Sequence, residues 1–297
     1  MSIHSSYFVS VQELRNVPGR IILTILVWLF WIRAYAQALR VPRASPGIGC
    51  QAYKKEPDIF SAAENVAALA RIEPGIGIYS ERNYFLSPLQ LFSAFAASHA
   101  FGGGAGIFLN HFGYKNFQEV EAGLAYAKNL GPKLSIGAKF NYYSLRIRGY
   151  VSKGTPNAEL GILFFPTSRF AAGFDIYNPV GGHLSNNADD KLASLIRLGM
   201  GYVFNPFFFL SLSVQKIEKQ PVAGLLSLHY VLNKYLFLQA GFQTTTSMLW
   251  MAGGCWLKKF RLDLRVSRHP MLGYSTAIAL LYSFKKEIAA PVNEVPE

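Results

Sequence analysis

The chain has 297 residues, of which 51% are hydrophobic, 14% aromatic and only 15% charged, and its formal net charge is +12. This charged fraction is low for a soluble protein, where about 25% is usual. Beyond the N-terminus, no uninterrupted apolar run approaches the roughly 20 residues that a transmembrane helix needs. An apolar chain without long apolar runs is typical of a transmembrane β-barrel, in which only every second residue faces lipid. A large soluble β-protein is the alternative.

Residues 1–36 have the parts of a signal peptide. Arg15 and Arg20 form a basic region, residues 21–32 form an apolar run, and Ala34-Tyr35-Ala36 provides a small-residue cleavage site. We therefore predict cleavage and export, with an uncleaved membrane anchor as the alternative.

Residues 37–75 differ in composition from the rest of the chain. Their first part is irregular, with several Pro and Gly residues. From Asp58 to Arg71 the alanine content favours a short helix, with Asp58 as its N-cap. We expect this stretch to be a plug-like segment in or against the periplasmic mouth of a barrel.

Residues 76–284 predict the barrel itself. In the stretch that begins at Phe260, even positions are apolar and odd positions are polar or charged, and the last strand alternates likewise up to Phe284. Because successive side chains of a strand point to opposite faces, such a hairpin has one apolar and one polar face. The same pattern recurs along the chain and gives about fourteen strands. We predict an all-β fold, an antiparallel up-and-down transmembrane barrel, followed by a tail at residues 285–297.

The connections between the predicted strands alternate in length. Links such as Asn205-Pro206 and Lys258-Lys259 are short, whereas Gly149–Pro156, Asn178–Lys191 and Arg268–Tyr274 are longer. Short turns at one end and longer loops at the other are typical of barrels in the outer membrane of Gram-negative bacteria. We expect that location, with both termini periplasmic.

The inward positions carry charges of both signs. Charged groups in a narrow lumen tend to pair, since an unpaired charge loses its hydration without compensation. This favours a filled interior over an open pore. The predicted charge network is Glu119, Glu121, Lys139, Glu159, Asp175, Arg197, Arg261, Asp263 and Arg265. Large apolar residues at other inward positions line an apolar path or pack against the plug, namely Phe95, Phe108, Phe165, Leu225 and Phe237.

Basic residues gather at the predicted short-turn end. They are Lys128, Lys133, Arg169, Lys234, Lys258, Lys259, Lys285 and Lys286. They do not form the stripe that binds nucleic acid. We expect this rim to meet the phosphates of outer-membrane lipid or lipopolysaccharide; an acidic periplasmic partner is the alternative.

Two alternatives stay open for the cysteines. Cys50 lies in the N-terminal segment, and Cys255 is assigned to an inward position near the periplasmic end of its strand. They either form a disulfide that pins the segment inside the barrel or remain two unpaired thiols, because pairing cannot be deduced from sequence. Ser227 and His229 share a strand face but are spaced unsuitably for a nucleophile pair. We predict no enzyme activity, metal or cofactor.

The chain resembles a known family. Asp58-Ile59-Phe60-Ser61 leads into Asn65-Val66-Ala67-Ala68-Leu69-Ala70, the strand series follows, and His269-Pro270-Met271-Leu272-Gly273 precedes the last strand. Together these features resemble the PorV-type proteins of Bacteroidota, distant relatives of the FadL long-chain fatty acid channel. Those families carry Asn-Pro-Ala-x-Leu-Ala before the first strand, and here Val66 takes the place of the Pro. The resemblance implies a fourteen-stranded barrel with an N-terminal plug.

Two functional hypotheses remain. The first is a non-enzymatic accessory subunit of an outer-membrane complex for type IX-like secretion or barrel assembly, motivated by the compact loops, charged lumen and basic rim. The second, which the FadL resemblance implies, is a channel for hydrophobic molecules such as fatty acids. A channel of that kind needs an apolar path or a lateral gap, and Pro88 and the Gly253-Gly254 pair are the candidates for a kinked strand.

Overall fold

The structure is a computed structural model that describes residues 51–181 and 192–284. All of these residues belong to one compact unit. The predicted signal peptide, Cys50, Lys285 and Lys286 lie outside the described residues. In the part of the chain that is described, no helix is long and apolar enough to cross a membrane.

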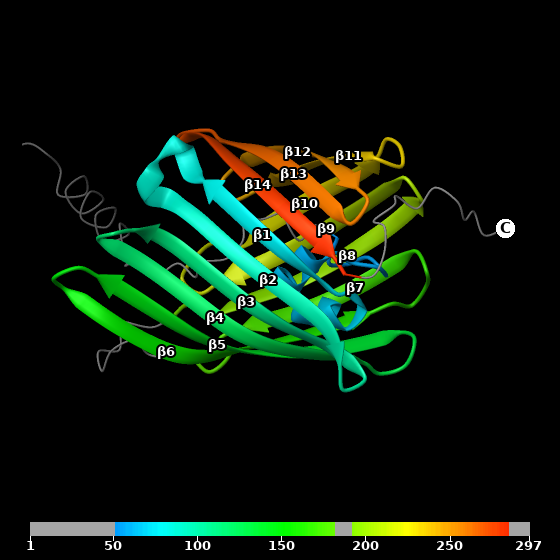
Figure 1. The fold of residues 1–297 in the computed structure, drawn as a ribbon, viewed down its shortest axis with the longest axis horizontal. Helices are drawn as coiled ribbons and strands as arrows, with labels where there is room; N and C mark the ends of the chain where they lie inside the picture. Colours follow the sequence, from blue (N-terminus) through cyan, green and yellow to red (C-terminus); the bar gives the residue numbers. More distant parts are fainter. Residues whose placement is uncertain (1–50, 182–191, 285–297) are drawn as a thin grey trace, which may run out of the picture. The chain divides into compact units, whose positions relative to one another are not determined.

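The described residues form a closed antiparallel barrel of fourteen strands (Figure 1). The strands are β1 (Gly75–Arg82), β2 (Gln90–Ala100), β3 (Gly103–Tyr114), β4 (Phe117–Asn129), β5 (Leu134–Ile147), β6 (Val151–Phe164), β7 (Phe170–Tyr177), β8 (Leu195–Asn205), β9 (Phe208–Ile217), β10 (Ala223–Val231), β11 (Leu236–Gln243), β12 (Met248–Leu257), β13 (Phe260–His269) and β14 (Gly273–Ser283). Each strand pairs with its neighbours in sequence, and β1 pairs with β14 from Gly75↔Ser283 to Arg82↔Thr276. The predicted fold class is confirmed.

Alternation of side chains along each strand explains the two surfaces. In β13, Arg261 and Arg265 are buried inside, whereas Leu264 on the outside is 57% exposed. In β8, Arg197 is buried and Leu198 is 58% exposed. An outward band of exposed apolar side chains around a polar interior is the arrangement that lipid requires of a barrel.

The two ends of the barrel differ less in loop length than the sequence suggests. We call the end with residues 101–102, 206–207 and 258–259 the short-turn end, and the opposite end the loop end. The predicted loop from Gly149 to Pro156 is wrong, because β6 already begins at Val151 and pairs with β5 from there. The loop predicted between Arg268 and Tyr274 is likewise reduced to residues 270–272.

One interstrand pairing is short. β6 pairs with β7 only over Glu159–Phe164, so its first half extends past the end of β7 toward the loop end. Asn178 donates its backbone N–H to the Ala158 carbonyl at 2.7 Å, just beyond that ladder. Because backbone groups alternate along a strand, the nitrogen of Pro156 points to the same side as the carbonyl of Ala158. On that side β7 has already ended, so the missing N–H of Pro156 costs no ladder hydrogen bond.

The predicted helix of residues 58–71 is wrong in detail. Two short 3-10 helices occupy the stretch, η2 (Ile59–Ala63) and η3 (Val66–Arg71). The reason is a second N-cap in mid-segment: Asn65 is extended, and its side chain accepts from the Ala67 backbone N–H, as Asp58 does from Ser61. Two further 3-10 turns, η4 (Asn83–Phe85) and η5 (Ser87–Leu89), join β1 to β2.

Candidate functional site

Residues 51–72 lie inside the barrel, and we call this segment the plug. Its strand neighbours show that it fills the short-turn half of the lumen: η3 packs against β3, β4, β5 and β6, and η2 packs against β1 and β2. In Figure 1 the plug is the group of short blue coils among the strands. Leu69 and Phe60 are both 1% exposed or less.

Inward glycines make room for the plug. A side chain at Gly199 would place its Cβ 2.0 Å from the Tyr53 ring, and one at Gly104 would lie 1.9 Å from the Leu69 backbone oxygen. Such approaches are possible only where no Cβ is present. Glycines on six strands meet the plug in this way: Gly77, Gly104, Gly137, Gly161, Gly173 and Gly199. We call these six positions the glycine seat.

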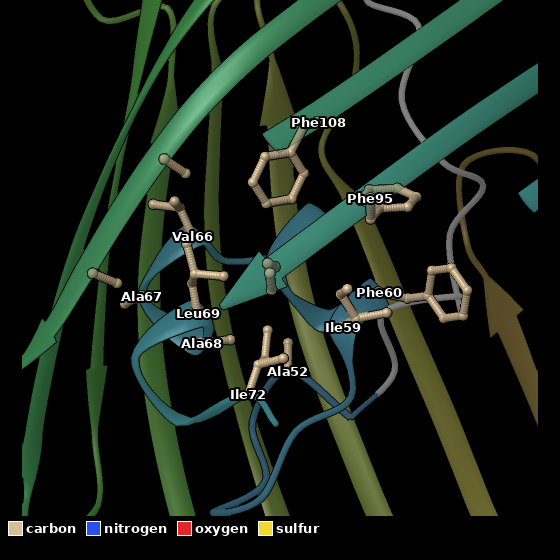
Figure 2. Close-up of a cluster of buried hydrophobic side chains, with 14 of the residues drawn as sticks. Ala52, Ile59, Phe60, Val66, Ala67, Ala68, Leu69, Ile72, Phe95 and Phe108 are labelled. Carbon is tan, nitrogen blue, oxygen red and sulfur yellow. The ribbon is translucent and has the colours of Figure 1, made fainter. Parts of the chain in front are cut away.

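Aromatic residues of the wall close around the apolar face of the plug. Figure 2 shows Phe95 and Phe108 beside the segment that carries Ile59, Phe60 and Leu69. The ring centroids of Phe60 and Phe95 are 5.5 Å apart, and those of Phe95 and Phe108 are 5.6 Å apart, both edge to face. Such pairs contribute about 0.5–1.5 kcal/mol beyond their buried area.

The five predicted lumen hydrophobes do not form one path. Phe95, Phe108 and Phe165 belong to the core around the plug, and the Arg71 guanidinium stacks 4.2 Å from the Phe165 ring. Phe237 packs instead with Val231 and Trp256. Leu225 is buried but lies in none of these clusters.

Polar groups of the plug also bind the wall. The Asn65 side-chain amide donates to the carbonyls of Ile162 in β6 and Phe174 in β7, at 3.2 and 3.1 Å. Arg71 donates to Ser135 Oγ at 3.0 Å and to the Pro132 carbonyl at 2.8 Å. These hydrogen bonds join the plug to β5, β6, β7 and the turn after β4, in addition to the packing.

Two ion pairs hold the plug from different strands. Arg261 of β13 lies 2.8 Å from Asp58 Oδ2 and 2.7 Å from Asp263 Oδ2. Arg197 of β8 lies 3.6 Å from Glu64 Oε1 and also donates to the Glu64 backbone carbonyl. All four groups of the two plug–wall pairs are at most 11% exposed. The acidic partners in both pairs come from the plug, and neither was among the lumen charges named from the sequence.

Tyr53 is a plug residue whose ionisable group is buried. Its ring is 2% exposed and lies against Gly199 and Gly201. Burial raises the pKa of its hydroxyl above the ordinary value, and the nearby Glu64 carboxylate raises it further.

Beyond the plug, buried acidic residues of the barrel wall lie on β4, β6 and β7, namely Glu119, Glu121, Glu159 and Asp175. Lys139 Nζ lies 2.6 Å from Glu159 Oε2. Glu121 accepts from Tyr177 Oη at 2.6 Å and from Asn110 Nδ2 at 3.1 Å. Glu119 and Asp175, the other predicted acids of this wall, are both at most 3% exposed.

Arg265 differs from every other predicted lumen charge. It is 6% exposed and its guanidinium lies 4.4 Å from the Trp250 ring. All three of its guanidinium nitrogens are buried without a hydrogen-bond partner in the structure. Its cross-strand neighbours are Ala252 and Ala277, which cannot supply one.

The remaining predicted residues lie elsewhere in the barrel. Cys255 does not face the lumen, because Gly254 and Trp256 take the inward positions of β12; the irregular Gly253-Gly254 pair obscured the alternation. The Gln239 amide nitrogen lies 3.1 Å from His229 Nδ1, and the imidazole stacks on Phe237. Pro88 is in η5, and Gly253-Gly254 are paired with both neighbouring strands, so neither marks a lateral gap.

The described basic rim residues are all exposed at the short-turn end: Lys128, Lys133, Arg169, Lys234, Lys258 and Lys259. The loop end is basic as well, with exposed Arg82, Lys115, Arg146, Arg148, Lys216, Lys219 and Arg268. Positive charge alone therefore does not distinguish the two ends of the barrel.

Solved outer-membrane proteins share this fold. A FadL homologue of Pseudomonas aeruginosa superposes with a TM-score of 0.57 at 10% identity, covering 84% of this chain and 100% of the other. The toluene transporter TbuX of Ralstonia pickettii gives 0.57 at 11% identity, over 82% and 99% of the two chains. The Pseudomonas putida toluene transporter TodX gives 0.56 at 12%, with 82% and 99% covered. No protein-family profile and no curated protein sequence matches the chain.

Proposed function

We propose that this protein is an outer-membrane channel for small hydrophobic molecules, closed at its short-turn end by the plug. The observation that carries the proposal is a fourteen-stranded closed barrel whose short-turn half is filled by its own N-terminal segment. Support comes from the fold shared with the toluene transporters. This similarity favours the channel over the accessory role in secretion or assembly, which was the first of the two hypotheses drawn from the sequence.

The plug blocks the path of a small molecule along the barrel axis. A molecule that enters from the loop end meets the plug, because Tyr53, Phe60 and Leu69 are buried against the wall. The glycine seat gives the plug a closely fitted position, and two ion pairs hold it there. Passage along the barrel axis therefore needs the plug to rearrange, and control of the channel resides in the plug.

The function is tested in intact cells of a Gram-negative host that lacks a hydrophobic channel of its own. Cells that express the full chain should take up radiolabelled toluene faster than cells with the empty vector, while uptake of a sugar of similar size stays equal. Equal toluene uptake, with the barrel shown by heat-modifiable gel migration to be folded in the outer membrane, would contradict the proposal.

The role of the plug is tested by locking it. Glu64 of the plug and Arg197 of the wall lie 3.6 Å apart at Oε1 and Nε. Cysteines at both positions, with Cys50 and Cys255 replaced by Ser, should be joined by a short bifunctional methanethiosulfonate that links plug and wall. We expect toluene uptake to fall on cross-linking and to return on reduction. The cysteine-free parent is the control and should be insensitive to both treatments.

A further inference from the structure

We propose that the outer surface of the barrel at the loop end binds lipopolysaccharide through Arg82 and Arg268, which take the two phosphates of its lipid A part. The site lies on the lipid-facing side of the pairing between β1 and β14. The inference goes beyond the proposed function, because it does not depend on what the lumen carries. It takes the loop end as the extracellular one, since outer-membrane barrels have their short turns in the periplasm.

The first argument is where the outward-facing charges lie. The charged side chains at exposed outward positions of the described strands are all basic: Arg82, Lys128, Arg146, Lys216 and Arg268. Four of them belong to the loop end, and only Lys128 belongs to the short-turn end. The exposed acids of the described chain, Glu56 and Glu73, lie in the plug or just after it and not on a strand. Near the loop end, the lipid-facing wall is therefore positive without any acid among its described residues.

The second argument is the spacing of two of these charges. Arg82 is directly opposite Thr276 of β14, and Arg268 is directly opposite Tyr274 on the other side of the same strand. With strands about 4.8 Å apart and a rise of about 3.4 Å per residue, the backbones of the two arginines are about 12 Å apart. Lipid A carries a phosphate at each end of a sugar pair, so each arginine can reach one of them.

The third argument is that both guanidinium groups are free to bind an anion. In residues 51–181 and 192–284, neither Arg82 nor Arg268 has an ion pair or a side-chain hydrogen bond. Their planar forks of donors match the oxygens of a phosphate. The free donors lie on the outside of the barrel, where only lipid or solvent can supply the acceptor.

The connection that follows Arg82 holds the two strand ends together. The Tyr84 backbone N–H donates to Ser275 Oγ at 3.0 Å, which joins η4 to β14. The Tyr84 ring also lies edge to face with His269 at the end of β13, with centroids 5.9 Å apart. The elements that carry the two arginines are thus fixed to one another before a ligand arrives.

The wall beside the two arginines is suited to acyl chains. On the same outward face, toward the middle of the barrel, Ile78, Val266 and Ile278 are exposed. The exposed ring of Tyr274 lies between the charged and the apolar part, the level at which aromatic residues meet lipid head groups. Two cations above an apolar wall fit a lipid with two phosphates better than a soluble phosphate, which would leave the wall unused.

The test measures lipid binding to the full-length barrel in detergent micelles by native mass spectrometry. The probe is bisphosphorylated lipid A, and heat-modifiable gel migration first shows that each variant is folded. A basic residue beside an anionic lipid contributes about fivefold in affinity. Arg82→Gln or Arg268→Gln alone should therefore weaken binding about fivefold, and the two together about 20- to 30-fold.

Two control pairs separate the site from net charge. Lys128→Gln with Lys259→Gln removes the same charge from exposed positions at the short-turn end, which lipid in a micelle can also reach. Binding by this pair should stay within about twofold of the wild type. Arg82→Lys with Arg268→Lys keeps both charges but loses the forks, and should weaken binding less than the glutamine pair.

Two further probes examine the phosphates themselves. Monophosphoryl lipid A keeps the acyl chains and lacks one phosphate, so it should bind the wild type about fivefold more weakly. With this probe, one of the two single changes should have no effect, because the phosphate that its arginine takes is gone. Phosphatidylglycerol, an anionic lipid with one phosphate and no sugar pair, should bind more weakly than bisphosphorylated lipid A.

A loss confined to the loop-end glutamine pair, with one arginine silent toward the monophosphoryl probe, supports the site. Equal loss in the glutamine pairs of both ends, or no loss in either, would overturn it. So would equal binding of the wild type to both forms of lipid A, or to phosphatidylglycerol, and these comparisons need no variant to fold. Toluene uptake does not enter any of these measurements, so a failure of the lipid site leaves the proposed channel standing.

Discussion

Arg261 and Arg265 lie on the same face of β13, yet their surroundings differ. Toward the short-turn end, Arg261 is held by Asp58 of the plug and by Asp263, at 2.8 and 2.7 Å. Nearer the loop end, the Arg265 guanidinium lies against the Trp250 ring and has no hydrogen-bond partner among the described residues. The short-turn half of the lumen is completed by the chain's own N-terminal segment. In the other half, no plug residue takes that part at Arg265.

The largest effect is expected where the plug meets Arg261. Arg261→Met should lower the free energy of unfolding by about 3–5 kcal/mol, because it leaves Asp58 and Asp263 buried without their counter-ion. Urea unfolding of the reconstituted barrel, followed by gel migration, measures the change. Lys259→Met, at an exposed position of the rim, is the control and should stay within about 0.5 kcal/mol. An equal effect of both changes would contradict a stabilising role of the buried ion pair between Arg261 and Asp58.

The glycine seat gives the next largest effect. Gly104→Val should cost about 1–3 kcal/mol and expose the plug to protease, since its Cβ would meet the backbone of Leu69, which cannot move aside as a side chain can. The matched change Gly253→Val is on an outward position whose nearest atom is 3.5 Å away. If limited proteolysis cuts both variants equally, the seat does not hold the plug.

Replacing Arg265 by Met should not lower the free energy of unfolding, in contrast to Arg261→Met. Arg265→Met removes a buried charge that has no partner in the described chain, so the unfolding free energy should stay the same or rise by up to about 2 kcal/mol. A loss as large as that of Arg261→Met would mean that Arg265 is paired within the chain. Such a result would remove the contrast between the two halves.

The smallest effect is expected at Tyr53, and it depends on pH. Because burial raises the pKa of this hydroxyl, the folded state keeps it neutral while the unfolded chain ionises from about pH 10. The free energy of unfolding should therefore fall as pH rises above 10, by about 1 kcal/mol at pH 10.5 for this group. Tyr53→Phe should remove that part of the fall and be nearly neutral at pH 7. Identical pH profiles for both proteins would contradict the assignment.

Alternation was sufficient to predict the strands and the inward position of residues such as Glu159 and Arg197, because lipid outside and a polar lumen inside impose it along the whole barrel. It was not sufficient at Cys255, where two glycines remove the pattern. Inward glycines such as Gly137 and Gly199 were visible in the sequence, but their purpose depends on a segment distant along the chain. Whether an arginine finds a partner depends on side-chain reach across strands, so the contrast between Arg261 and Arg265 emerges only in three dimensions.

The seam between β1 and β14 has a consequence for how the protein is assembled. It joins Gly75 to Ser283, the most distant strand pairing along the chain, so its closure carries the greatest loss of chain entropy. The plug leads directly into β1, and one buried core contains plug residues together with Tyr79 of β1 and Ala279 of β14. The core that seats the plug thus also includes side chains from both strands of the seam.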